Sequence, residues 1–168
     1  ALFKGKNFTF LSNGILGDRL VAMVKKFRIP LTVMSLDGDA KVYRKIRGVD
    51  NYAGVLKTAC RLKNLTQVGL CFTQTPWNSV ADYRHVKRIC QKNGYRFLFN
   101  IYSNMSYMGQ NRQKTKLINP FYDRSDSLYA KTYNRWAKGE LTIPCFYMRS
   151  SCVIHPNGDV VLCQWKNA

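Results

Sequence analysis

The chain has 168 residues, of which 46% are hydrophobic, and it carries 27 Lys and Arg against 9 Asp and Glu, a formal net charge of +18. This length suits one domain with at most a small appendage, and the hydrophobic content excludes an intrinsically disordered chain. The apolar runs are shorter than the roughly 20 residues that span a bilayer, and the first residues lack a signal-peptide pattern, so we expect a cytoplasmic protein without a membrane segment.

Strands and helices are predicted to alternate along the chain. Alternating or continuous apolar runs predict strands at 7–11, 31–36, 67–73 and 96–101. Apolar residues at three- and four-residue spacings predict helices at 17–27, 52–62, 79–93 and 125–138. Successive strands begin about 24 to 36 residues apart, the size of a βαβ unit, so we expect parallel strands with right-handed crossovers. Four such units form an open sheet or part of a barrel.

Polar residues follow the second predicted strand at its carboxyl end. The run from Leu31 ends in Ser35-Leu-Asp-Gly38, and Ile46-Arg-Gly48 comes ten residues later. The carboxyl end of a strand is where α/β proteins place ligand-binding groups. Asp-Gly is also common in simple turns, so the pair is either a site or a turn.

Basic residues gather on one face of the predicted helix at 79–93. Arg84, Lys87, Arg88 and Lys92 share that face by their spacing. The face is either a solvated outer surface or a contact for an acidic partner. The chain has no block of five or six consecutive basic residues, which excludes a basic tail.

The six cysteines form two groups. Cys60, Cys71 and Cys90 fall within predicted helices or a strand and are expected to be small buried hydrophobes. Cys145, Cys152 and Cys163 cluster near the end of the chain. In a reducing compartment such a cluster favours a metal or iron–sulfur site over a disulfide, although the spacing does not match a zinc ribbon.

The last two cysteines flank a predicted hairpin. Asn-Gly at 157–158 lies between two apolar runs, which is the strongest short hairpin signal. A two-residue turn there places Ile154 opposite Val161 and Cys152 opposite Cys163. Two thiols in that position can share a metal or cluster, form a disulfide or merely pack, and a three-residue loop would break the pairing.

Several motifs follow one another in a fixed order. They are Phe10-Leu-Ser-Asn-Gly14, then Ser35-Leu-Asp-Gly38, then Ile46-Arg-Gly48, then Asn78, and finally Cys145-x12-Gly-x4-Cys163. The first four resemble signatures in the barrel of radical S-adenosylmethionine (radical SAM) enzymes. The last is similar to the opening of their SPASM or twitch extension, which holds auxiliary [4Fe–4S] clusters.

The chain departs from this family at its start. The CxxxCxxC motif that holds the radical-generating cluster is absent, and so is the glycine-rich segment. The resemblance implies an α/β fold with about four βα units of a partial (βα)6 TIM-like barrel, at 1–138, and a cysteine-bearing β-hairpin extension at 139–168. We expect the chain to be a fragment that is inactive alone and whose parent is an enzyme.

The resemblance also implies roles for individual residues. Ser35 would lie near the ribose or carboxylate of S-adenosylmethionine, and Asp37 would face the same cavity or cap its loop. Arg47 would bind the cofactor carboxylate or an acidic substrate, or else anchor its loop. Asn78 would bind the cofactor or cap the following helix, and we favour the cap. The cluster ligands would be Cys145, Cys152 and Cys163.

The implied function is that of a radical SAM iron–sulfur oxidoreductase. Its reduced [4Fe–4S] cluster cleaves S-adenosylmethionine, and the resulting radical abstracts hydrogen from a peptide or protein substrate. The basic surface suits an acidic substrate or partner. The alternative is a non-enzymatic basic α/β module that binds nucleic acid or another polyanion, although no RNA-recognition or helix-turn-helix motif supports it.

Overall fold

The computed structural model describes residues 9–101 and, beyond them, positions 128, 131–132, 135, 139–142, 153–154 and 159–161. The chain divides into two compact units, Ala1–Tyr102 and Ser103–Ala168, each of which is described by itself. The domain boundary expected at 138/139, where the cysteine-bearing extension would begin, stays a prediction.

The first unit alternates strands and helices. Its elements are β1 (Thr9–Ser12), α1 (Gly17–Phe27), β2 (Leu31–Ser35), α2 (Ala40–Arg47), α3 (Tyr52–Leu62), β3 (Gln67–Gln74), α4 (Val80–Asn93) and β4 (Arg96–Ile101). All strands and helices predicted within this unit are present, and α1 and α3 have the predicted bounds. Only α2 was not predicted.

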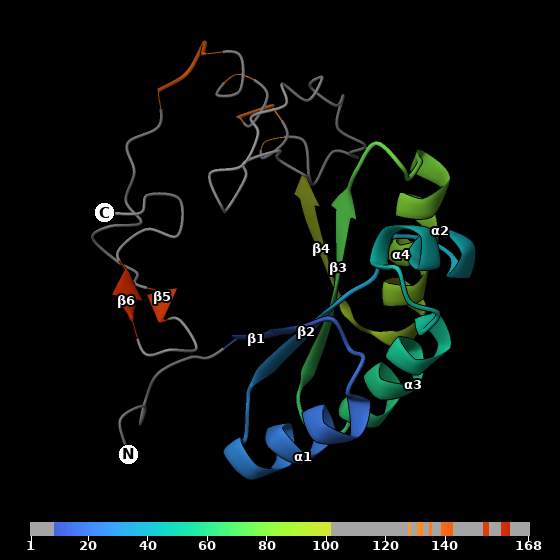
Figure 1. Ribbon diagram of the computed structural model, residues 1–168, viewed down its shortest axis with the longest axis vertical. Coiled ribbons are helices and arrows are strands. Elements are labelled where there is room, and N and C mark those ends of the chain that lie inside the picture. Colours follow the sequence, from blue (N-terminus) through green and yellow to red (C-terminus); the bar gives the residue numbers. More distant parts are fainter. Residues whose placement is uncertain are drawn as a thin grey trace. The chain divides into compact units, whose positions relative to one another are not determined.

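The four strands form one parallel sheet in the order β1-β2-β3-β4. Figure 1 shows the four helices together on one side of this sheet. A doubly wound sheet has helices on both faces, whereas a βα barrel has sequential strands with all helices outside. The unit is therefore a mixed α/β fold that is arranged like part of an α/β barrel.

Aromatic side chains build the core between α4 and the sheet. The Tyr83 ring of α4 meets Phe72 edge-on at 5.8 Å and Phe97 edge-on at 5.3 Å between centroids. Phe72, Leu70 and Met34 are completely buried. These strand residues alternate with others along β2 and β3, as expected when every second side chain faces the helices.

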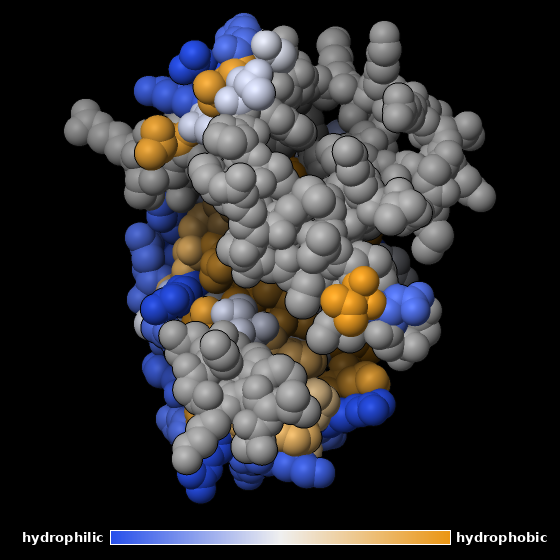
Figure 2. Space-filling model, turned by 90° about the vertical axis from the view of Figure 1, so that its left-hand side faces the viewer, coloured by the Kyte–Doolittle hydropathy of each residue, from blue (hydrophilic) through white to orange (hydrophobic). Residues whose placement is uncertain are grey.

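The opposite face of the sheet carries the other set of side chains. It includes Leu11, which is 67% exposed, and towards the carboxyl ends it includes Ser35, Cys71 and Thr73, which are half-buried. Figure 2, which views the molecule from this side, shows apolar side chains in the centre and hydrophilic side chains along the borders. In a barrel, this face lines the interior.

Helix α2 begins and ends at residues with clear local signals. The Asp39 carboxylate oxygen Oδ1 accepts the Val42 N–H at 2.9 Å, and so caps the helix. Gly48 ends the helix in the left-handed conformation, at φ +70°, and its N–H donates to the Arg44 carbonyl at 2.9 Å. The segment between β2 and α3, for which no element was predicted, thus contains a capped two-turn helix.

The second unit is described at few positions. Leu128, Lys131, Thr132 and Arg135 are helical. Gly139 has φ +77°, and the Glu140 N–H donates to the Arg135 carbonyl at 2.8 Å. These observations agree with the predicted helix and with its end at Gly139.

Two short strands of this unit pair antiparallel. They are β5 (Val153–Ile154) and β6 (Val160–Val161), and Ile154 lies opposite Val160. The prediction that Ile154 faces Val161 is therefore wrong by one residue, because that prediction assumed a two-residue turn. The predicted ligands Cys145, Cys152 and Cys163 lie outside the described residues, as does the expected pairing of the last two.

Within the described part of the chain, every helix is too short or too polar to cross a membrane.

Candidate functional site at the carboxyl edge of the sheet

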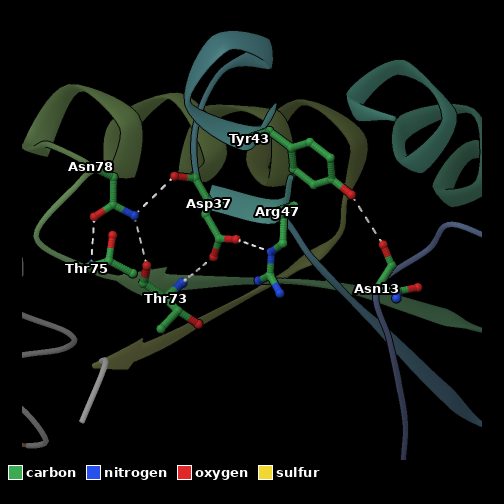
Figure 3. A network of polar contacts seen from close by, with 7 residues as sticks. All are labelled: Asn13, Asp37, Tyr43, Arg47, Thr73, Thr75 and Asn78. Carbon is green, nitrogen blue, oxygen red and sulfur yellow. Dashed lines mark hydrogen bonds and ion pairs between the residues drawn. The ribbon is translucent and has the colours of Figure 1, made fainter. Parts of the chain in front are cut away.

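Asp37 is the centre of a polar network where β2 and β3 end. Its carboxylate is completely buried. Oδ2 accepts the Arg47 Nε–H at 2.6 Å, and Oδ1 accepts the Thr73 N–H at 3.1 Å (Figure 3). The Arg47 side chain is 29% exposed. The ion pair therefore joins the last residue of α2 to the segment between β2 and α2, and the Thr73 N–H bond ties that segment to β3.

Asn78 joins the same two strand ends through its side-chain amide. Nδ2 donates to the Asp37 carbonyl at 3.1 Å and to the Thr73 carbonyl at 2.9 Å, while Oδ1 accepts the Thr75 N–H at 2.8 Å (Figure 3). This amide replaces backbone partners that the chain loses where the strands end. The expectation that Asn78 caps α4 is wrong.

Ser79 caps α4 instead, as part of a capping box. The Asp82 N–H donates to Ser79 Oγ at 3.4 Å, and the Ser79 N–H donates to Asp82 Oδ2 at 2.9 Å. The reciprocal bonds explain why the carboxylate of Asp82 is buried at the start of the helix.

Gly38 makes room for that buried carboxylate. A Cβ at position 38 would lie 2.7 Å from Asp82 Oδ1 and 2.8 Å from Val42 Cγ1. Its φ of +151° is also rare for residues with a side chain. The Asp37-Gly38 pair is thus a packed junction of three elements, and a simple exposed turn is excluded.

The loop after β1 reaches the same edge. The Gly14 N–H donates to Ser12 Oγ at 3.0 Å, and the Ile15 N–H donates to Asn13 Oδ1 at 3.1 Å. The Tyr43 hydroxyl of α2 donates to the Asn13 carbonyl at 3.5 Å (Figure 3). Burial raises the pKa of Tyr43, the nearby Arg47 lowers it, and the Asp37 carboxylate adds to the rise. The phenol therefore remains a hydrogen-bond donor at neutral pH.

Ser35 and Cys71 are neighbours in the register of β2 and β3, on the face without helices. Both are half-buried. Burial raises the pKa of the Cys71 thiol, the Asp37 carboxylate raises it further, and a hydrogen bond with Thr73 and the charge of Arg47 oppose the rise. The thiol is thus neutral at physiological pH.

The structure brings together three of the four predicted cofactor-binding residues. Asp37, Arg47 and Asn78 are joined directly or through shared backbone groups, and Ser35 lies at the same edge, two residues before Asp37. Sequence reasoning missed Thr73 and Thr75, which supply the N–H groups of the network. A signal was present, since polar residues follow the apolar part of β3.

Arg47 retains donors for a ligand. Its Nε is engaged by Asp37, and the described residues provide no partner for its two terminal nitrogens. Figure 3 shows one of these nitrogens on the Asp37 side of the guanidinium and the other turned away from Asp37. A guanidinium oriented by one carboxylate can bind a second carboxylate or a phosphate.

The described residues contain no group of three or more His, Cys, Asp or Glu that is arranged to hold a metal. Of the three cysteines expected to be buried, Cys90 is buried, Cys71 is half-buried and Cys60 is exposed. The expectation is therefore wrong for Cys60, which lies on an outer side of α3.

Comparisons with known proteins support the fold. No family model matches the chain, and no curated protein matches it either. Among solved structures, the crystal structure of SuiB from Streptococcus suis, a radical SAM-family protein, is similar with a TM-score of 0.62 at 19% identity. The match covers 94% of this chain and 44% of SuiB, so the chain spans less than half of that protein's length. At this identity the likeness supports the fold alone, a mixed α/β arrangement that is shared with SuiB.

Proposed function

We propose that this chain is part of a radical SAM enzyme and forms one wall of its cofactor site. The observation that carries the proposal is the Asp37–Arg47–Asn78 network at the carboxyl edge of β2 and β3. The order of the sequence motifs and the structural likeness to SuiB support it. S-adenosylmethionine would supply the radical chemistry after reductive cleavage by an iron–sulfur cluster.

The donors at this edge suit S-adenosylmethionine. The cofactor carries an amino-acid carboxylate and ribose hydroxyls, and the edge offers the terminal guanidinium nitrogens of Arg47 and the hydroxyl of Ser35. Asp37 orients the guanidinium, because a completely buried carboxylate at 2.6 Å from Nε leaves Arg47 little freedom to turn. Asn78 positions Asp37 by holding its carbonyl.

A titration followed by nuclear magnetic resonance tests this assignment in the 168-residue chain. S-adenosylmethionine should shift the signals of the Thr73 amide and the Arg47 side chain. Arg47→Met should weaken binding by about tenfold to a hundredfold, because a charge-assisted hydrogen bond contributes about 1.5–3 kcal/mol. Arg44→Met is the matched control on the same helix and should leave the affinity unchanged. Absent shifts at this edge, or equal affinities of the two variants, contradict the proposal.

The cysteine set of the second unit belongs to the same proposal. Cys145, Cys152 and Cys163 would bind an auxiliary [4Fe–4S] cluster, since thiolates are the usual ligands of such clusters. The 168-residue sequence lacks a CxxxCxxC motif, so it would not cleave S-adenosylmethionine by itself.

Anaerobic reconstitution tests the cluster. The wild-type chain should bind iron and sulfide in equal amounts, and Cys152→Ala and Cys163→Ala should each lose them. Cys60→Ala is the control, because this thiol lies in the first unit and should not affect cluster content. Zinc uptake without sulfide, or full cluster content in the Cys163 variant, would contradict this assignment.

The parent's substrate is proposed to be a peptide or protein.

A further inference from the structure

A groove of about 400 Å³ separates α3 from α4 on the outer side of the helix layer. Its lining residues Asn93 and Tyr95 come directly before β4, so the groove lies towards the amino edge of the sheet. The carboxyl-edge network is at the other end of the strands. The groove is therefore separate from the proposed cofactor site.

The groove combines an apolar wall with a basic rim. Leu56 of α3 and Ile89 of α4 are half-buried in it, while Arg88 and Lys92 are exposed at its border. None of the described residues that line it is acidic. A ligand with both apolar and anionic groups fits this lining, because each part would meet its complement.

The His85 ring in the groove wall is fixed by a contact across the two helices. Its Nε2 is 2.7 Å from the Tyr52 hydroxyl of α3, and the two rings stack with centroids 6.2 Å apart. Burial raises the pKa of Tyr52, so the hydroxyl keeps its proton for this bond. This contact links α3 to α4 and so makes the groove a preformed feature.

The spacing of the cations matches an extended chain. Arg84, Arg88 and Lys92 are four residues apart and exposed, so they follow one another about every 6 Å along α4. Every second side chain of an extended peptide points the same way, at a repeat of about 6.6 Å. A peptide with an acidic residue at every second position would therefore place one carboxylate near each cation.

We propose that this groove docks an extended acidic segment of a protein partner, with apolar residues between the acidic ones. The acidic side chains pair with Arg84, Arg88 and Lys92, and the apolar ones contact Leu56 and Ile89. The apolar wall favours a peptide over a nucleic acid, because non-specific nucleic-acid sites rely on several exposed stacking rings. Tyr95 and His85 are the rings in the described lining, and both are half-buried. This surface is independent of the proposed cofactor function.

Fluorescence anisotropy at low salt tests the proposal with the full chain. The probe is a fluorescein-labelled peptide of sequence GELELEG, and GQLQLQG is its uncharged match. The groove variant is Arg88→Glu with Lys92→Glu, and the control variant is Arg19→Glu with Lys41→Glu, on exposed positions of α1 and α2. Each double variant lowers the formal net charge by four, from +18 to +14. Circular dichroism establishes that both variants are folded.

We expect GELELEG to bind and GQLQLQG not to bind. The groove variant should bind GELELEG about tenfold more weakly, because two ion pairs become two repulsions, and the control variant should change the affinity less than about twofold. Equal losses in the two variants would overturn the proposal in favour of general charge attraction. Absence of GELELEG binding would also overturn the proposal. So would an oligouridine that binds more tightly than GELELEG and whose binding is lost in the groove variant. S-adenosylmethionine binding should be unaffected in the groove variant, which separates this test from that of the cofactor site.

Discussion

Replacement of Arg47 by methionine should destabilise the protein far more than the same replacement of Arg44. Both arginines lie on α2 and each pairs with an aspartate. Arg47 contacts a carboxylate that is completely buried, at 2.6 Å, whereas the Arg44–Asp50 pair spans 3.8 Å with side chains that are 65% and 71% exposed. The two variants therefore compare a buried charge with an exposed one on the same helix.

The expected magnitudes follow from what each variant leaves behind. Among the described residues, Arg47→Met leaves the buried Asp37 carboxylate with one hydrogen-bond donor, the uncharged Thr73 N–H. Removing one partner of a buried pair costs about 3–5 kcal/mol, and the 29% exposure of Arg47 places this case near the lower end, at about 3 kcal/mol. Arg44→Met removes an exposed pair and should cost less than about 1 kcal/mol.

Urea unfolding followed by circular dichroism measures both free energies of unfolding. A double-mutant cycle adds Asp37→Asn, which removes the charge but retains an oxygen for the Thr73 N–H. In that background Arg47→Met should cost much less, because no buried charge is stranded. If Arg47→Met and Arg44→Met differ by less than about 1 kcal/mol, the argument that the buried ion pair organises this edge is refuted.

Three further outcomes follow from the geometry. Gly38→Ala should lower the free energy of unfolding by more than about 2 kcal/mol, because its Cβ would lie 2.7 Å from Asp82 Oδ1. Gly48→Ala is the control, because nothing lies within 4 Å of its new Cβ, and it should lower the free energy of unfolding by about 1 kcal/mol. Thermal unfolding measures both variants, and equal losses of stability in Gly38→Ala and Gly48→Ala would contradict the steric argument. Iodoacetamide should modify the exposed Cys60 much faster than the buried Cys90 in the native protein, as peptide mapping would show, and equal rates would disprove the assigned burial. Burial raises the pKa of Cys90 from 9.0 to about 12, so the folded state retains this proton and stability should fall as pH rises from 9 towards 12. Cys90→Ala should make that alkaline fall shallower, and an unchanged slope would argue against the shift.

Local patterns were sufficient to predict most of the first unit. Strands β2 to β4 and helices α1 and α3 have strong periodicity. Helix α4 ends at Asn93, as predicted, and Gly94 follows it in the left-handed conformation. Helix α2 was missed because it has only eight residues and one fully buried side chain, Tyr43. Asp39 and Gly48 mark its two ends, and together they would have revealed it.

The site was predicted in position but not in detail. Strand ends in a parallel sheet meet at one edge, which is why Asp37, Arg47 and Asn78 were expected near one another. Which atoms pair depends on the register of β2 against β3 and on the path of the loop before α4, and neither follows from local spacing. The amide of Asn78 therefore holds the Asp37 carbonyl, although its position before a helix indicated a cap. Similarly, a helical repeat cannot show which side of α3 leaves Cys60 exposed.

The sequential strand order has a consequence for how the first unit folds. Among the four described strands of this unit, each pairs only with its neighbours in the chain, as in Thr9 with Leu31, Leu31 with Gln67, and Gly69 with Arg96, separations of 22, 36 and 27 residues. Loop-closure entropy grows only with the logarithm of length, so these three closures differ by less than about 0.5 kcal/mol. None of these three strand pairings requires a distant part of the chain to be in place first. Folding of the sheet can therefore begin at any of the three pairings and extend to the neighbouring strands.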